Sequence, residues 1–217
     1  MFTIKVFTFN PVQENTYLLY NEQNECIIID PGCYSPEEQQ VLQMFITDNN
    51  LVPKLLVNTH CHLDHVFGNK FISETYGLTL QLHPNEEKML EKAPASGLMF
   101  NLPFDNYQGD LIFLQPGQTI KLGNDQLEII FAPGHSPGSI CFYCAEQSFI
   151  ISGDVLFHQS IGRTDLPGGD HKTLLQSIRE KILVLPDDVT VYSGHGTETT
   201  VGSEKISNPF VGSHITG

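Results

Sequence analysis

Tryptophan is absent from this 217-residue chain, cysteine is scarce, and long apolar runs are missing. The five cysteines are an odd number, too sparse for the disulfide framework of a small secreted domain. The longest unbroken apolar run covers the six residues 140–145, whereas a membrane helix needs about 20. The first residues do not place a long apolar stretch after a charged segment. We therefore expect no secretory signal, no membrane association and a reducing, cytoplasmic location.

Positive charge is scarce as well. Lysine and arginine number 11 against 25 acidic residues, so the net charge is −14. Without a basic excess, non-specific binding to nucleic acid or to anionic membranes is disfavoured. An acidic balance is compatible with a protein that houses cations. The hydrophobic fraction of 40% is ordinary for a globular protein, and the length suits one domain, expected over residues 1–217.

Short strand-like segments alternate with helical ones along the chain. One expected helix begins after Ser35 as N-cap, with Pro36 at its first position, and another ends at Gly77. A short helix is expected over residues 85–92, a loop that forms a lid or rim over residues 93–108, and a further helix over 172–183. Strands are expected at 3–9, 16–20, 26–29, 54–58, 78–82, 111–114, 119–122, 127–131, 139–144, 148–151 and 189–192. This order predicts an α/β fold of two face-to-face sheets with helices outside.

The histidines carry the strongest signal. Three of them lie within six residues, together with an aspartate, directly after an expected strand. Two more histidines and a second aspartate each follow an apolar strand and have a glycine neighbour. Strand ends that share one sheet edge would bring these side chains together. The seven candidates are His60, His62, Asp64, His65, His135, Asp154 and His195.

Imidazole and carboxylate donors suit zinc, iron, manganese or nickel in an open site, unlike the thiolates of structural zinc. Seven donors are more than one tetrahedral ion can bind. They suit two ions, with one carboxylate that bridges them and open positions for water. Two close ions can deprotonate a water near neutral pH. A chance scatter of histidines is the alternative, and it fits a lone residue better than this cluster. His83, His158 and His171 are lone histidines with no expected metal role, and His214 is expected to lie exposed in the tail.

The motif His-x-His-x-Asp-His, followed by distant His, Asp and His, resembles the metallo-β-lactamase superfamily over nearly the whole chain. The resemblance implies an αββα sandwich with a metal site at one sheet edge. It implies two divalent ions, zinc first, with iron or manganese as alternatives, and a bridging hydroxide as nucleophile. Asp64 and Asp154 become the candidate catalytic carboxylates. The first ion falls to His60, His62 and His135, the second to Asp64, His65 and His195, and Asp154 bridges them.

Within that superfamily the chain is similar to the short glyoxalase II-like hydrolases. Three segments carry the likeness, at residues 10–17, 30–32 and 160–165. Such enzymes cleave small thioesters such as S-lactoylglutathione, the expected partner of this protein. The sequence given stops soon after the last ligand, so the C-terminal helical domain that contacts glutathione in longer members is expected to be missing. The oligomeric state stays open.

Two other functions stay open. Persulfide dioxygenases share the histidine motif and a Gly-Arg-Thr-Asp segment like residues 162–165. They use one iron, whose ligands here would be His60, His135 and Asp154, in the pattern of non-haem iron sites. A catalytically silent metal-binding or sensor protein is the second alternative. Lactamases and lactonases fit the short length and this segment less well, and RNA-processing nucleases fit the charge poorly.

Three further side chains have two interpretations each. Arg163 is either a clamp for a substrate anion or a partner of Asp165. Cys61, between two candidate ligands, is either a redox switch or a spacer that faces away from the metals, and we favour the spacer. Cys141 and Cys144 are three apart in a strand, which places them on opposite faces and favours small core residues over a redox pair.

Overall fold

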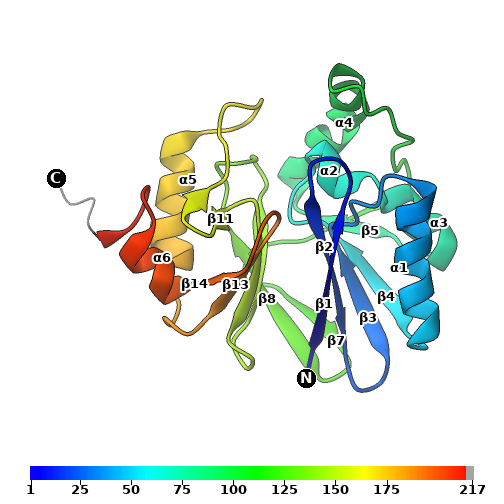
Figure 1. Cartoon of the computed structure of the whole chain (residues 1–217), viewed down its shortest axis with the longest axis horizontal. Helices are drawn as coiled ribbons and strands as arrows, with labels where there is room; N and C mark the ends of the chain where they lie inside the picture. The colour runs from blue at the N-terminus through cyan, green and yellow to red at the C-terminus, as the bar shows by residue number, and fades with distance from the viewer. Residues whose placement is uncertain (214–217) are drawn as a thin grey trace. The chain divides into compact units, whose positions relative to one another are not determined.

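The structure of the protein is a computed structural model that describes residues 1–213 (Figure 1). The chain divides into two compact units. The first consists of residues 1–114 with 121–126, and the second of residues 115–120 with the chain from Leu127 onward. One six-stranded sheet lies in the first unit, and most of a second six-stranded sheet lies in the second unit. The single domain expected from the length stays a prediction.

The first sheet runs in the order β1-β2-β3-β4-β5-β6. Its first two pairings are antiparallel and the next three are parallel. Parallel neighbours end at one edge of the sheet, so the segments that follow β3, β4 and β5 emerge side by side. The strands are β1 (Thr3–Phe9), β2 (Glu14–Tyr20), β3 (Glu25–Ile29), β4 (Val52–Val57), β5 (Leu80–Leu82) and β6 (Leu111–Phe113).

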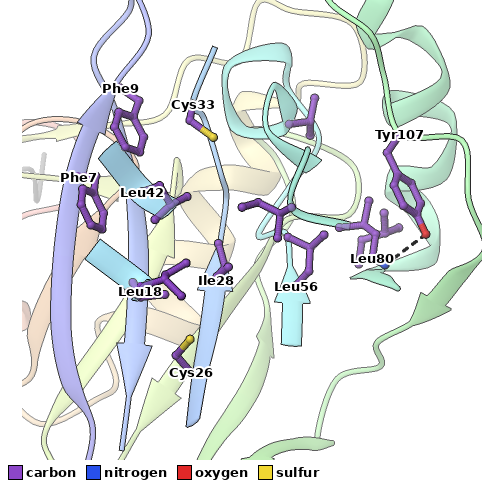
Figure 2. Close-up of a cluster of buried hydrophobic side chains, with 14 of the residues drawn as sticks. Phe7, Phe9, Leu18, Cys26, Ile28, Cys33, Leu42, Leu56, Leu80 and Tyr107 are labelled. Atoms are coloured by element: carbon purple, nitrogen blue, oxygen red, sulfur yellow. Dashed lines mark hydrogen bonds between the residues drawn. The ribbon is translucent and has the colours of Figure 1, made fainter. Parts of the chain in front are cut away.

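Helices pack on one face of this sheet and close a hydrophobic core (Figure 2). Leu42 of α1 and Ile72 of α3 are fully buried against strand residues such as Leu18 and Leu56. The predicted start of α1 is confirmed, because Ser35 and Glu38 form a capping box. Gly77 ends α3 in the left-handed conformation, also as predicted. The helical elements are α1 (Pro36–Asp48), α2 (Leu63–Val66), α3 (Asn69–Tyr76), the 3₁₀ turn η1 (Pro84–Glu86) and α4 (Glu87–Met99).

Helix α4 corrects one expectation, because it runs through residues that were expected to form a lid or rim loop. Pro94 lies inside the helix, and a proline there removes the amide that would bond the carbonyl four residues earlier. That carbonyl belongs to Leu90, and the Asn106 side-chain amide donates to it at 2.8 Å. The replacement hydrogen bond explains why the proline is tolerated. The loop begins only after Met99.

The second sheet has the strand order β14-β13-β10-β9-β8-β7. The β8–β9 and β9–β10 pairings are antiparallel and β10–β13 is parallel. A separate hairpin of β11 and β12 lies between β10 and the next helix. Two-residue strands such as these lack the alternation that would reveal them. The strands are β7 (Thr119–Leu122), β8 (Asp125–Phe131), β9 (Ile140–Cys144), β10 (Phe149–Gly153), β11 (Leu156–Phe157), β12 (Ser160–Ile161), β13 (Thr190–Ser193) and β14 (Thr199–Thr200).

Helices of the second unit pack on one face of its sheet, with Leu174, Ile178 and Val201 fully buried against strand residues. The helix expected over residues 172–183 is confirmed, but its hydrogen-bonding pattern changes along its length. It starts as an α-helix capped by Asp170 and continues as a π-helix. The elements are α5 (His171–Ser177), η2 (Ile178–Ile182) and α6 (Val201–Ser207).

All five cysteines are buried. Cys141 lies in the core of the second unit and Cys144 is 3% exposed, as expected for small core residues. Burial raises the pKa of Cys26 to about 12 and moves the pKa of Cys33 in the same direction. Across residues 1–213, we find no helix with the length and apolar character needed to span a bilayer. His214 lies outside the described residues.

Glu204 of α6 provides a test of the second unit's stability. Its carboxylate is fully buried and accepts hydrogen bonds from the Thr199 hydroxyl at 2.6 Å, the Gln159 amide at 3.0 Å and the Asn208 side chain at 2.7 Å. Glu204→Ala leaves three donors without this acceptor, so we expect it to lower the free energy of unfolding by about 3 kcal/mol. Urea denaturation measures the change. The exposed Glu146→Ala should change it little, and an equal loss in both variants would contradict the assignment.

Candidate metal centre

Four candidate ligands follow β4 in the first unit. His60 and His62 lie in the loop after the strand, and Asp64 and His65 lie in α2. His60 and His65 are fully buried, and His62 is 9% exposed. The His60 ring centroid lies 4.9 Å from that of His62 and 4.1 Å from that of His65. The sequence prediction that these histidines gather is therefore confirmed within this unit.

Asp30, directly after β3, orients two of these histidines. It contacts His65 directly and His60 through Thr59. Its Oδ2 atom accepts the Thr59 hydroxyl at 2.5 Å and lies 3.1 Å from His65 Nδ1. Its Oδ1 atom accepts the Thr59 amide at 2.7 Å and the Asn58 side chain at 3.1 Å. Ligand atoms of Asp30, His60 and His65 lie within 4.8 Å of one another. Because both Asp30 oxygens are engaged in these bonds, we assign Asp30 to orientation.

This network also assigns the histidine tautomers. The only proton of the Thr59 hydroxyl goes to Asp30, so the Thr59 oxygen accepts from His60 Nδ1, 3.1 Å away. His65 Nδ1 lies next to the Asp30 carboxylate, which accepts hydrogen bonds, so His65 Nδ1 carries a proton as well. In both rings the lone pair is then on Nε2, the nitrogen left for a metal. A carboxylate that orients a ligating histidine in this way also increases its basicity.

Asp64 and the neighbouring main chain are held from a different side. The Asn10 side-chain amide donates to the Asp64 carbonyl and to the Gly32 carbonyl, both at 3.0 Å. The Asp64 carboxylate Oδ2 lies 3.7 Å from His65 Nε2. The carboxylate therefore lies on the metal-facing side of His65.

A second carboxylate, Glu14, lies behind His65. Glu14 is fully buried, and its Oε1 atom lies 3.7 Å from His65 Nδ1. Its Oε2 atom accepts the Thr16 hydroxyl at 2.9 Å. Burial raises the pKa of Glu14 well above its usual range. We therefore assign Glu14 to packing against His65 on the side of Nδ1.

The remaining candidates gather in the second unit. Asp154 follows β10, His195 follows β13, and His135 lies in the loop after β8. The Asp154 Oδ2 atom lies 3.4 Å from His135 Nε2 and 3.7 Å from His195 Nε2. The Gly194 amide donates to the Gly153 carbonyl at 2.8 Å, so the parallel strands β10 and β13 stay joined beyond the register shift between Ile151 and Gly153. This unit thus brings together all three of its predicted ligands.

Here a main-chain carbonyl orients the histidine. His135 Nδ1 lies 2.7 Å from the Arg163 carbonyl oxygen, so Nδ1 donates and Nε2 points toward Asp154. Gly162 allows this approach, because a Cβ atom there would lie 1.9 Å from the Asp154 carbonyl oxygen and 3.0 Å from His135 Nδ1. The Gly-Arg segment noted in the sequence therefore has a structural function beside the ligands.

The side chains with two interpretations are now placed. The Arg163 guanidinium forms two hydrogen bonds with Asp165, at 2.7 and 2.8 Å, and this pairing lowers the pKa of Asp165 to about 2. A role for Arg163 in substrate binding stays a prediction. Cys61 packs in the core of the first unit, as expected of a spacer. His83 Nδ1 accepts the Asn85 amide and so caps η1.

Sequence reasoning missed the supporting residues. Glu14 and Asp30 fall in the segments at 10–17 and 30–32, and Asn58 ends an expected strand, but no sequence pattern gives them or Thr59 a role. One local signal does point to Asp30, which follows a buried apolar strand as Asp154 does. Nothing in the sequence indicates that Glu14 reaches His65.

Asp30→Asn tests the orienting network. The variant replaces one acceptor oxygen by a donor, so the proton on His65 Nδ1 or on Thr59 loses its acceptor. We expect metal affinity to fall by about 10–100-fold, as for other residues that orient ligands. Isothermal titration with Zn²⁺ measures the affinity, and nitrogen-15 NMR of the histidines reads the tautomers. Thr59→Ser keeps the hydroxyl and should retain affinity. Unchanged tautomers and affinity in Asp30→Asn would refute this assignment.

The donors in both units fit a metal. Buried imidazoles with Nδ1 fixed by an acceptor, beside carboxylates, are the ligands of catalytic zinc and of iron or manganese, with no thiolate among them. Divalent metal binding is therefore supported by the chemistry of the residues.

Comparison with known proteins supports the same conclusion. The model of the metallo-beta-lactamase superfamily matches residues 9–195. A hydroxyacylglutathione hydrolase, GloC of Haemophilus influenzae, is 39% identical over 212 residues, which cover 97% of this chain and 98% of the relative. The crystal structure of BLEG-1 B3 metallo-beta-lactamase has a TM-score of 0.88 and 37% identity, covering 99% of this chain and 100% of that one. TTHA1623 in a di-iron-bound form has a TM-score of 0.84 and 34% identity, covering 95% and 99%.

These matches confirm the fold class expected from the histidine motif, a mixed α/β fold of two sheets and helices. The chain belongs to the metallo-β-lactamase superfamily of metallo-hydrolases.

Proposed function

We propose that the protein is a metal-dependent hydrolase that cleaves a small thioester of the S-lactoylglutathione type. The observation that carries the proposal is the likeness to the hydroxyacylglutathione hydrolase GloC, which extends over 97% of this chain and 98% of that protein. We expect the protein to act in the cytoplasm.

Seven residues would hold two divalent ions, zinc being the expected metal and iron the alternative that the di-iron form of TTHA1623 favours. When bound, two such ions lower the pKa of a shared water and polarise the substrate carbonyl. The first unit would supply His60, His62, Asp64 and His65 as donors, and the second unit would supply His135, Asp154 and His195.

The chain's own contribution is to fix proton positions before substrate arrives. Asp30 and Thr59 keep protons on the Nδ1 atoms of His65 and His60, and the Arg163 carbonyl keeps one on His135 Nδ1. The ligand nitrogens are then preorganised, so little reorganisation is needed during the reaction. Burial of His60, His65 and His135 keeps water away from these rings.

A β-lactam is the second candidate substrate, because BLEG-1 is 37% identical over almost the entire chain. Both substrates are acyl compounds that a hydroxide attacks at the carbonyl carbon. Oxidation of a persulfide with one iron per chain, and metal binding without turnover, stay as the other outcomes.

Turnover and metal content measured on one sample test the proposal. Purified protein is supplied with S-lactoylglutathione, the β-lactam nitrocefin, or glutathione persulfide with oxygen, and its metal is quantified. We expect thioester hydrolysis with about two ions per chain. Nitrocefin cleavage without thioester cleavage would move the assignment to a lactamase. Oxygen consumption with one iron would favour a dioxygenase, and no turnover would favour a sensor.

Removal of a predicted ligand tests the site. His60→Ala and Asp154→Asn should lower metal content and reduce kcat/KM for the substrate that is turned over by about 100-fold or more, since the nucleophile depends on the ions. The exposed His171→Ala is a matched control and should retain both. Full activity in a variant that has lost its metal would refute the mechanism.

A further inference from the structure

Glu86 is a buried carboxylate that the proposed mechanism does not use. It is the last residue of η1 and is fully buried. Its Oε2 atom accepts the main-chain amide of Cys61 at 2.8 Å. Cys61 is the residue between His60 and His62, so this carboxylate binds the middle of the ligand loop.

Sheet topology brings these two segments together. Strands β4 and β5 are parallel neighbours, with Leu56 opposite Leu80. The Asn58 amide extends the pairing with a hydrogen bond of 2.9 Å to the Gln81 carbonyl. The ligand loop after β4 and the turn after β5 therefore emerge at the same sheet edge.

The Glu86 side chain does not cap the helix that it precedes. It is the N-cap residue of α4, yet its side chain makes no capping hydrogen bond to that helix. The positive end of the 13-residue helix nevertheless favours a carboxylate at this point. The carboxylate is thus available for the Cys61 amide, 25 positions earlier in the chain.

Cys61 is held on both sides. Its thiol is 1% exposed and packs in the core of the first unit, while its amide donates to Glu86. The rings of His60 and His62, on either side of it, lie almost perpendicular, at 88°. Any rotation of the main chain at Cys61 would move both rings relative to each other.

We propose that Glu86 is a positioning residue of the metal centre, which fixes the main chain between His60 and His62 through the Cys61 amide. This inference rests on the proposed metal-dependent function. It goes beyond that function because Glu86 would contact neither metal nor substrate, but would set how tightly the loop holds its ion.

A pair of variants of similar size tests the proposal. Glu86→Gln keeps an oxygen that accepts from the Cys61 amide, whereas Glu86→Met keeps the length of the side chain and lacks that oxygen. Co²⁺ alone is titrated into the metal-free full chain, and its visible absorption reports affinity and ligand geometry. We expect Glu86→Met to bind Co²⁺ about 10–100-fold more weakly and with a changed spectrum. Glu86→Gln should stay within about threefold of the original protein.

Glu204→Met is the matched control. Glu204 is also fully buried and also accepts a main-chain amide, that of Gln159, which is not a candidate ligand. We expect Glu204→Met to lower the melting temperature without changing the Co²⁺ spectrum. The proposal is overturned if Glu86→Met keeps both affinity and spectrum, or if Glu204→Met weakens Co²⁺ binding as much.

Hydrogen exchange of the original protein keeps the test decisive if Glu86→Met does not fold. The Cys61 amide should exchange more slowly than exposed loop amides in the metal-free protein, and rapid exchange would refute the proposal. These readouts need no substrate. A protein that binds Co²⁺ as expected but leaves thioesters intact would refute the proposed function and leave the inference about Glu86 standing.

Discussion

The hydrogen bonds of the Asp30 carboxylate constrain much of the first unit's site. This one side chain receives the Thr59 amide, the Thr59 hydroxyl, the Asn58 side chain and His65 Nδ1. A buried carboxylate is costly unless its lone pairs are occupied, and here four donors occupy them. The same bonds that make its burial tolerable also fix two imidazoles in one tautomer. Stability of the loop and readiness for metal therefore have a common origin.

In the second unit a different kind of group orients the histidine ring. There the Arg163 carbonyl, a main-chain atom, orients His135, and Gly162 provides the space for it. A carbonyl oxygen can only accept a hydrogen bond, so it fixes the proton on His135 Nδ1, whereas the Asp30 side chain has this function for His65 in the first unit. In both units the ligands follow strand ends, where the sheet fixes the main chain and the loop is free to present side chains.

The longer strands and the grouping of the candidate ligands could be predicted because their signals are local: an apolar run is followed by clustered histidines, or by a glycine and then a histidine or an aspartate. The first part of helix α4 was predicted as a helix over residues 85–92. Its continuation through residues 93–99 could not be predicted, since Pro94 argues against a helix unless Asn106 is known to satisfy the Leu90 carbonyl. Asp30 and Glu86 were missed for a related reason. Their function depends on contacts over 29 and 25 positions of sequence, which no pattern of neighbouring residues reveals.

Both proposed substrates, a thioester and a β-lactam, would be attacked at a carbonyl carbon. The residues that distinguish them would therefore lie outside the set of candidate ligands. Arg163 is the one candidate named from sequence, and it is paired with Asp165, which remains ionised above a pKa of about 2. Both side chains are largely exposed, and exposed ion pairs contribute little to stability. An anionic substrate could therefore displace Asp165 at small cost. The observed pair is compatible with an anion clamp at Arg163, and a neutral acyl compound would leave that pair intact.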